Sequence, residues 1–250
     1  DYTNRGRIIT PLKDRFGSQI RTHYPLETDT EVQIVRQEAR PPSVGNVTVT
    51  VPAYMERVVA TFSQLARSSS QVNQRSGVSV RLSVSNYEVM AANALRRGLR
   101  LGETNVVPRV CDLEAFAAST GGKIEIEALE EGREGQVLRD LIKASVLTVF
   151  REVVSPELTR AVLASFEEGA VVHTGEDVGS EDQAMLLGNI PALRPIVDSL
   201  IEGDDSAASV AAAVEFILEG MHLSKRLNKD TSATGGGTYR SRTVTPSAIN

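Results

Sequence analysis

Apolar residues recur every three or four positions over several long segments of this chain, a pattern typical of helices that bury one face. The clearest segment runs from Glu134 to Val153 and ends shortly before Pro156. Its apolar stripe consists of Val137, Leu138, Leu141, Ile142, Val146, Val149 and Phe150. The same spacing predicts helices at 28–39, from Pro52 to Ala66, from Ser79 or Ser85 to Leu101, and at 156–168, 180–187, 191–201 and 206–227. We therefore expect a mainly α-helical fold.

The two ends of the chain differ from this pattern. Ser18 to Tyr24 alternates polar and apolar residues, which predicts a strand between a short helical turn at 10–16 and Pro25. Val44 to Val51 alternates in the same way and predicts an extended connector. Residues 229–250 are rich in Ser, Thr, Gly and Arg, a composition that predicts a disordered tail.

Composition places the chain among ordinary globular proteins and narrows its expected partners. Of its 250 residues, 41% are hydrophobic, and no run reaches the roughly 18 apolar residues of a membrane span. The net charge of −5 disfavours a nucleic-acid partner. The single cysteine, Cys111, favours a reducing compartment, and the first residues lack the apolar segment of a signal peptide. We expect a cytoplasmic protein with neither a nucleic-acid nor a membrane partner.

Familiar catalytic motifs are missing from the sequence. It contains no phosphate-binding Gly-x-x-x-x-Gly-Lys-Ser/Thr loop and no Gly-x-Ser-x-Gly motif. His23, His173 and His222 are far apart and lack the spacing of metal ligands, so we expect no metal site. Cys111 has no neighbouring base and is expected to be a small buried residue. The acidic clusters at 125–134 and 176–182 are expected to be solvated faces.

Two arginines are placed where a guanidinium could bind phosphate. Arg15 lies in Leu12-Lys13-Asp14-Arg15-Phe16-Gly17, at the end of the predicted turn before the predicted strand. Arg81 lies at the start of a predicted helix, where the helix N-terminus already favours anions. Arginine stays charged and its planar fork binds phosphate oxygens, although each of these residues by itself is more commonly a surface charge. Near the end of the same helix, the helix dipole explains the cluster Arg96, Arg97 and Arg100.

The same segments carry a resemblance to a known family. Leu12–Gly17, Ile20–Pro25 and Thr30–Ile34 follow one another as do the Leu-x-Asp-Arg-Phe segment, last core strand and Glu-containing lid helix of magnesium-chelatase and MoxR-type AAA+ ATPases. Ser76–Arg81 resembles the sensor-2 motif of this group, with Val80 in place of the usual proline. The resemblance implies the end of an α/β core at 1–25, a helical lid at 26–108, an additional helical domain at 109–228 and the tail at 229–250.

The family resemblance implies an ATP hydrolase that works as a homo-oligomeric ring, expected to be a hexamer. The ring would couple Mg-ATP hydrolysis to remodelling of a partner or to metal insertion, with a von Willebrand A-domain protein as the implied partner. Arg15 would be the arginine finger that reaches the γ-phosphate held by the adjacent subunit, and Arg81 would be sensor 2. The segments that bind most of the ATP and Mg²⁺ would precede Asp1, so this chain alone is expected to be inactive.

Two other classes of function stay open at this point. A non-enzymatic helical adaptor would present Val137–Phe150 and Ala208–Met221 to a partner. A helix-turn-helix regulator would use the basic run from Arg96 to Arg100, although the acidic net charge disfavours it.

Overall fold

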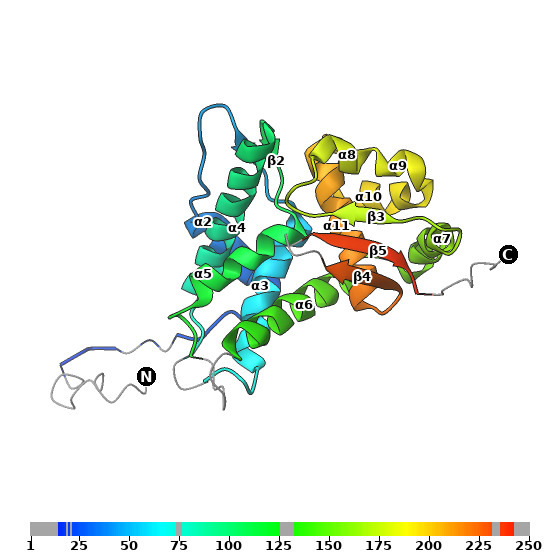
Figure 1. Cartoon of the computed structure of the whole chain (residues 1–250). Helices are drawn as coiled ribbons and strands as arrows, with labels where there is room; N and C mark the ends of the chain where they lie inside the picture. The colour runs from blue at the N-terminus through cyan, green and yellow to red at the C-terminus, as the bar shows by residue number, and fades with distance from the viewer. Residues whose placement is uncertain are drawn as a thin grey trace.

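The computed structural model describes residues 15–18, 20, 22–73, 77–125, 133–231 and 236–242, and there the chain is mainly helical (Figure 1). The first half contains α2 (Thr28–Glu38), β1 (Thr48–Val49), α3 (Ala53–Ser68), α4 (Val80–Leu101) and β2 (Asn105–Val106). The middle contains the 3₁₀ helix η1 (Val110–Ala115), α5 (Phe116–Thr120), α6 (Glu134–Val153) and α7 (Pro156–Glu167). The remainder contains β3 (Val172–Thr174), α8 (Ser180–Ala184), α9 (Leu186–Asn189), η2 (Pro191–Leu193), α10 (Arg194–Leu200), α11 (Ala207–Leu223), β4 (Leu227–Thr231) and β5 (Gly237–Ser241).

The expected mainly α-helical class is confirmed, and most predicted helices are present. α6 has both predicted ends, because its apolar period is uninterrupted and Pro156 starts the next helix. The predicted helix at 180–187 is divided into α8 and α9 at Met185, and the predicted helix at 191–201 begins as the 3₁₀ turn η2. The predicted strand at 18–24 is wrong for its described residues, which form no strand. Most of the predicted turn at 10–16 lies outside the described residues.

Helices α2, α3 and α4 pack together in the first half of the chain. β1 and β2 form a short parallel pair, with Thr48 opposite Asn105 and Val49 opposite Val106. This pairing explains the alternating stretch predicted at 44–51, and it joins the segment after α2 to the segment after α4. The pairing thus holds the chain that leaves α2 next to the chain that leaves α4.

One hydrophobic core runs across the expected domain boundary at 108/109. α3 packs on α6 as well as on α2 and α4, and its buried residues lie on nearly all sides. The ring centres of Tyr54 on α3 and Phe216 on α11 lie 4.6 Å apart. The ring centres of Phe216 and Phe150 on α6 lie 6.1 Å apart. The boundary therefore does not separate two cores, and the expected lid and additional domain share one.

Helix α11 is the central helix of the second half. Every residue from Ala208 to Met221 is buried, and the helix packs on α6, α8, α10 and β4 (Figure 1). Its small side chains permit close approach, and a Cβ at Gly220 would lie 2.1 Å from the ring of Phe150. Among the described helices, none combines the length and apolar character needed to cross a membrane.

The two surfaces that the adaptor hypothesis assigned to a partner are occupied within the chain. The apolar stripe of α6 is buried in the common core, and α11 is enclosed on all sides. That form of the adaptor hypothesis is therefore wrong, because tertiary packing has already used both faces.

The expected disordered tail at 229–250 is wrong for residues 229–231 and 237–241, which belong to a three-stranded antiparallel sheet ordered β3-β5-β4. Tyr239 of β5 pairs with Val172 and Lys229 and is fully buried. Its hydroxyl donates a hydrogen bond to Glu219 of α11 at 2.6 Å. One buried aromatic residue thus fixes a segment of otherwise polar composition against the core. Residues 232–235 and 243–250 lie outside the described part.

Candidate functional site

Helix α4 begins where Ser79 caps its first turn, and Arg81 lies on that turn. The Ser79 hydroxyl accepts a hydrogen bond from the Arg81 backbone N–H at 3.3 Å, which satisfies one of the free donors at a helix start. Of the two expected starts, Ser79 and Ser85, the structure has the first. The Arg81 side chain is exposed and makes no hydrogen bond or ion pair with any residue that the structure describes. Its charge is therefore available to an anion from outside the chain.

Beside the start of α4, Arg67 of α3 and Glu31 of α2 form a buried ion pair. Arg67 Nη1 and Nη2 donate to Glu31 Oε2 and Oε1 at 2.6 and 2.7 Å, a two-pronged geometry that fixes both side chains. Glu31 is 0% exposed and Arg67 only 12%. The hydroxyl of Ser83 on α4 donates to the same carboxylate. Glu31 thus joins the three helices of the bundle through one buried charge.

Arg67 also contacts the turn before α4 and the segment before α2. Its Nε donates to the backbone carbonyl of Val78 at 2.9 Å. Its guanidinium carbon lies 4.9 Å from the centre of the Tyr24 ring, within cation–π distance. Gly77 makes this approach possible, because a Cβ there would lie 2.6 Å from the Tyr24 hydroxyl oxygen, and its φ of +69° favours glycine. The segment before α2 is therefore seated against the turn that leads into α4.

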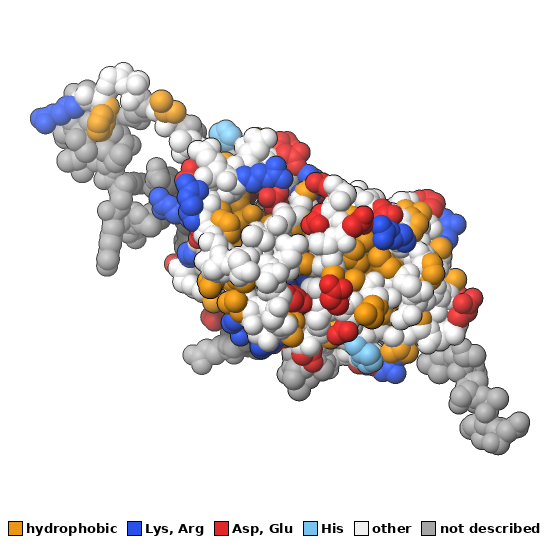
Figure 2. All heavy atoms as spheres, turned by 90° about the horizontal axis from the view of Figure 1, so that it is seen from above, with side chains coloured by type: hydrophobic (Ala, Val, Ile, Leu, Met, Phe, Trp, Pro, Cys, Tyr) orange, Lys and Arg blue, Asp and Glu red, His pale blue; other side chains and the backbone are white. Residues whose placement is uncertain are grey.

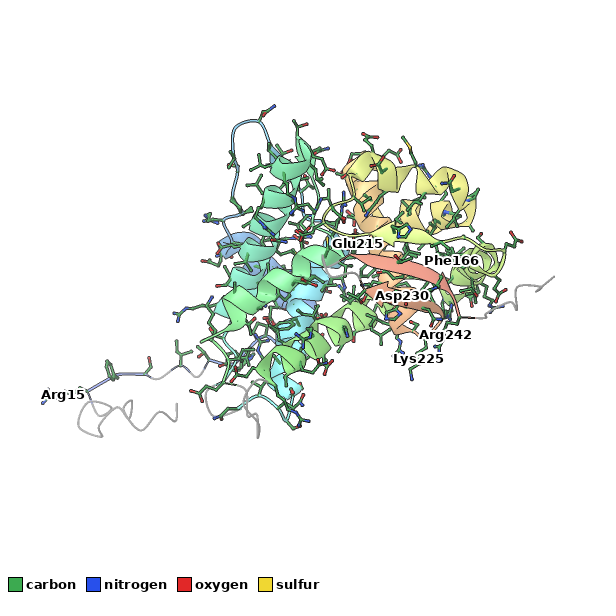
Figure 3. All side chains as sticks on the ribbon, in the orientation of Figure 1. Arg15, Phe166, Glu215, Lys225, Asp230 and Arg242 are labelled. Carbon is green, nitrogen blue, oxygen red and sulfur yellow. The ribbon has the colours of Figure 1, made fainter. Side chains whose placement is uncertain are left out.

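Arg15 lies at the outer end of that segment, exposed and away from the helical body (Figure 3). The structure does not bring Arg15 and Arg81 together. The same segment exposes 55% of Phe16, 90% of Ile20 and 81% of Leu26. Large apolar side chains gathered on an exposed segment usually mark a surface that another structure covers.

Arg97, which the sequence analysis explained by the helix dipole, is fully buried. Its Nη2 donates to Asp112 Oδ2 at 3.0 Å and to the backbone carbonyl of Val107 at 2.9 Å. The Asp112 carboxylate, also fully buried, accepts from the Arg109 backbone N–H and from Asn93 Nδ2, each at 2.9 Å. The helix dipole is thus not the reason for Arg97. Arg97 instead forms an internal ion pair with Asp112, which joins α4 to η1.

Arg109 and Glu215 continue this network to α8 and α11. Arg109 donates to the backbone carbonyl of Val178 at 2.7 Å and to Ser180 Oγ at 2.6 Å. Glu215 Oε1 accepts from the Cys111 backbone N–H at 2.7 Å. The network therefore connects the first bundle to the second half of the chain through buried charges as well as through apolar packing.

Burial shifts the acid–base behaviour of the network. It lowers the pKa of Arg109, with the nearby charge of Arg97 acting in the same direction, and it raises the pKa of Glu215. Burial also raises the pKa of the Cys111 thiol well above its ordinary value, with Glu215 adding to the effect. A thiol in this state is a poor nucleophile, as expected for Cys111, although the residue is only partly buried.

Several buried polar atoms of this region have no hydrogen-bond partner among the described residues. They are Tyr54 Oη, Arg97 Nη1, Glu103 Oε2, Arg109 Nε, Gln183 Oε1 and Nε2, and Glu215 Oε2. Buried groups of this kind are usual positions for internal water. Because Arg97, Arg109 and Glu215 bind other groups of the chain, we assign this network to the junction between the first bundle and the second half.

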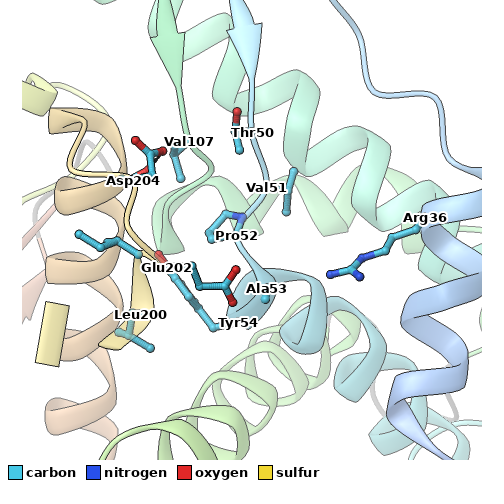
Figure 4. Close-up of a pocket in the computed structure, with 12 residues that line it drawn as sticks. Arg36, Thr50, Val51, Pro52, Ala53, Tyr54, Val107, Leu200, Glu202 and Asp204 are labelled. Carbon is cyan, nitrogen blue, oxygen red and sulfur yellow. Dashed lines mark hydrogen bonds between the residues drawn. The ribbon is translucent and has the colours of Figure 1, made fainter. Parts of the chain in front are cut away.

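A groove of about 270 Å³ opens between the first turn of α3 and the loop after α10 (Figure 4). Tyr54 and Leu200 line it, and Glu202 extends into it from a backbone with a left-handed φ of +50°. Its cation, Arg36, is already held by Glu56, with Arg36 Nε 2.9 Å from Glu56 Oε2. Because that cation is neutralised and Glu202 adds negative charge, the groove suits a phosphate less well than the first turn of α4.

The remaining candidates show no shared chemistry. His23, His173 and His222 hydrogen-bond to Tyr24, Thr238 and Leu227, respectively, and lie on separate elements. Among the described residues, no group of three or more His, Cys, Asp or Glu side chains could hold a metal ion. Residues 126–132 of the acidic cluster at 125–134 lie outside those residues.

The basic run at the end of α4 does not form a free basic surface. Arg96 and Arg100 both pair with Glu176, at 3.5 and 3.2 Å, while Arg97 is internal. On the face shown in Figure 2, basic and acidic side chains are interspersed among neutral ones. The helix-turn-helix hypothesis thus loses the feature that favoured it. No protein-family model, curated protein or solved structure matches the chain.

Proposed function

We propose that this chain forms the helical lid and C-terminal extension of a magnesium-chelatase-like AAA+ ATPase. In the proposal, Arg81 contacts the nucleotide of its own subunit and Arg15 contacts that of the neighbouring subunit in a ring, expected to be a hexamer. The observation that carries the proposal is the exposed guanidinium of Arg81 on the capped first turn of α4, unpaired among the described residues. The adjacent Tyr24 contact seats the segment that leads to Arg15 against the same bundle.

Both arginines suit the chemistry of phosphoryl transfer. ATP supplies the transferred phosphoryl group, and negative charge spreads over its oxygens in the transition state. A positioned cation lowers the barrier most when it is aimed at this developing charge and needs no reorganisation. The backbone that carries Arg81 is held in place for this role, because Ser79 caps its turn and the buried Glu31 carboxylate ties α4 to α2 and α3.

The exposed apolar residues of the N-terminal segment support the same assignment. In the proposed α/β core, Phe16 and Ile20 would lie at or beside the last strand and be covered by neighbouring elements. In this chain the described residues of the segment form no strand. A strand needs neighbours for its backbone hydrogen bonds, and the proposal supplies them from segments before Asp1.

The residues present fit the phosphate groups of ATP and not its metal. Unpaired guanidinium groups can bind phosphate oxygens, whereas no cluster of three or more His, Cys, Asp or Glu side chains that could hold a metal ion occurs among the described residues. The metal and most of the nucleotide would therefore be held by the segments expected before Asp1. The work of the ring, remodelling of a partner or metal insertion, and the von Willebrand A-domain partner belong to the same proposal.

A complementation experiment tests the role of Arg15 in the neighbouring site. It uses a longer polypeptide that includes the expected phosphate-binding segments. Arg15→Ala should lower ATP turnover on the order of 10²–10³-fold while nucleotide affinity changes little. Mixing Arg15→Ala subunits with phosphate-loop variants should restore activity, because some interfaces then combine an intact loop with an intact Arg15.

Arg96→Ala is the matched control for Arg15→Ala, since Arg96 is also an exposed arginine and lies near the C-terminal end of α4, away from Arg81. It should leave turnover within about twofold, as expected for a surface charge. Unchanged turnover in Arg15→Ala, or mixed rings of normal size without restored activity, would contradict the proposed role. The 250-residue chain by itself should release no phosphate from ATP, and measurable hydrolysis would overturn the assignment of the catalytic site to preceding segments.

A further inference from the structure

Arg67 holds three structural units with one side chain. Its two terminal nitrogens bind Glu31 of α2, its Nε binds the Val78 carbonyl before α4, and its flat face lies near the Tyr24 ring. All three nitrogens of the Arg67 guanidinium already donate within the chain and the side chain is only 12% exposed, so we do not assign it to the nucleotide. Tyr24 lies in the segment that carries Arg15, Val78 lies in the turn before Arg81, and Glu31 lies on the helix that follows Tyr24.

We propose that Arg67 is a positioning residue that clamps the Tyr24 end of the Arg15-bearing segment to the turn before α4, so that Tyr24 and the start of the Arg81 helix move as one unit. The contacts of Arg67 do not depend on the proposed function, but any effect of Arg67 on catalysis does. In a ring, it would make the position of the segment that carries Arg15 depend on the position of α4.

Only arginine can make these contacts at the same time. A lysine has one compact ammonium group, which can pair with Glu31 but cannot also reach Val78 and present a flat cationic face to Tyr24. Arg67→Lys therefore keeps the buried charge balanced while it removes the clamp. The more disruptive loss of the whole cation, which would leave the buried Glu31 carboxylate unpaired, is avoided.

The chain has no tryptophan, so Tyr24→Trp creates a single fluorescent reporter at the clamp. The matched control is His23→Trp, one residue earlier in the exposed segment. We expect acrylamide to quench the Tyr24→Trp indole at least twofold less efficiently than the His23→Trp indole, because one face of the ring at position 24 lies against Arg67. Arg67→Lys should raise the quenching at position 24 to the level at position 23, and it should leave the quenching at position 23 unchanged.

A second pair of variants tests the clamp without changing Arg67. Gly77→Ala places a methyl group where the Tyr24 hydroxyl lies, whereas Gly102→Ala introduces the same methyl at a similar φ, +75°, with nothing within 4 Å. Both variants strain the backbone equally and should lose similar thermal stability. In the Tyr24→Trp chain the indole is about as long as the tyrosine side chain that it replaces and meets the same methyl group, so only Gly77→Ala should raise the quenching of the indole.

Equal quenching of the indoles at positions 24 and 23 in otherwise unchanged chains would overturn the clamp. So would quenching at position 24 that does not respond to Arg67→Lys, or that responds equally to the two glycine variants. These measurements need no nucleotide, so their outcome is separate from the complementation experiment. If the quenching results support the clamp but the Arg15 complementation fails, Arg67 would still be a positioning residue of the segment. Only its proposed effect on catalysis would be lost.

Discussion

Removal of the Asp112 carboxylate tests whether the buried junction is a fixed part of the fold. Asp112 is fully buried and accepts hydrogen bonds from Arg97, Arg109 and Asn93. Asp112→Ala deletes these bonds and leaves the buried Arg97 charge with only the Glu103 carboxylate, whose Oε2 lies 3.6 Å from Arg97 Nη1. Breaking a buried pair in this way costs about 3–5 kcal/mol, a large part of the roughly 5–15 kcal/mol by which domains are stable.

Urea unfolding followed by circular dichroism measures this loss. With an m value of about 2 kcal/mol per molar, the midpoint should fall by roughly 2 M. Asp140→Ala is the control, because Asp140 is an exposed aspartate on α6, and it should change stability by no more than about 0.5 kcal/mol. In the double variant Arg97→Met with Asp112→Ala, the buried charge is gone, so the loss should be about 2 kcal/mol smaller than the sum of the two single losses.

The reasoning would be refuted by an Asp112→Ala loss below about 1 kcal/mol, which is the size of an ordinary surface effect. Strict additivity of the two single variants would refute it as well, because two groups that compensate each other in the interior cannot be independent. Either result would mean that the junction is open to water, and the two halves would then be joined mainly by the apolar core.

Three further substitutions probe separate parts of the fold. Gly220→Ala should destabilise the chain by about 3 kcal/mol in urea unfolding, because the added Cβ would lie 2.1 Å from the Phe150 ring; a neutral effect would mean that α6 and α11 are not in contact. Glu202→Gly should raise stability by about 0.5–1 kcal/mol, since it relieves a left-handed φ of +50°, and a loss would show that the glutamate is held by an unseen contact. Burial alone would raise the pKa of Glu219, but the ion pair with Lys229 lowers it below the ordinary value, so its contribution to stability is present at neutral pH and is lost as pH falls through that lowered pKa. Glu219→Gln should therefore reduce the loss of stability measured between pH 7 and pH 3, and an unchanged pH profile would contradict this assignment.

Local sequence pattern was sufficient for the helices and for the surroundings of Arg81. The apolar period of α6 is unbroken between Glu134 and Val153, so a single helix is the best local conformation. Ser79, one of the two helix starts that the sequence left open, satisfies a free N–H at the start of α4, and this cap places Arg81 on the first turn. These features depend on residues within one or two turns of each other, and such contacts can be recognised in a linear sequence. The roles of Arg15 and Arg81 stay predictions.

The neighbourhoods of the other charged residues could not be predicted in this way. Arg67 looks like any arginine on the polar side of a helix, and its partners Glu31 and Tyr24 come from a different helix and from the segment before it. Arg97 lies in a basic run that the helix dipole alone could explain, yet η1 provides the carboxylate that makes its burial possible.

The sequence by itself therefore determined which segments are helical and where Arg81 lies, because helix period and capping are local. Only the tertiary structure decided that the two expected domains share one core, that α11 is enclosed and that Tyr239 holds a strand in the expected tail. The physical reason is that the burial of a side chain depends on what packs over it. For charged residues and for isolated aromatic residues, that covering comes from parts of the chain far away in the sequence.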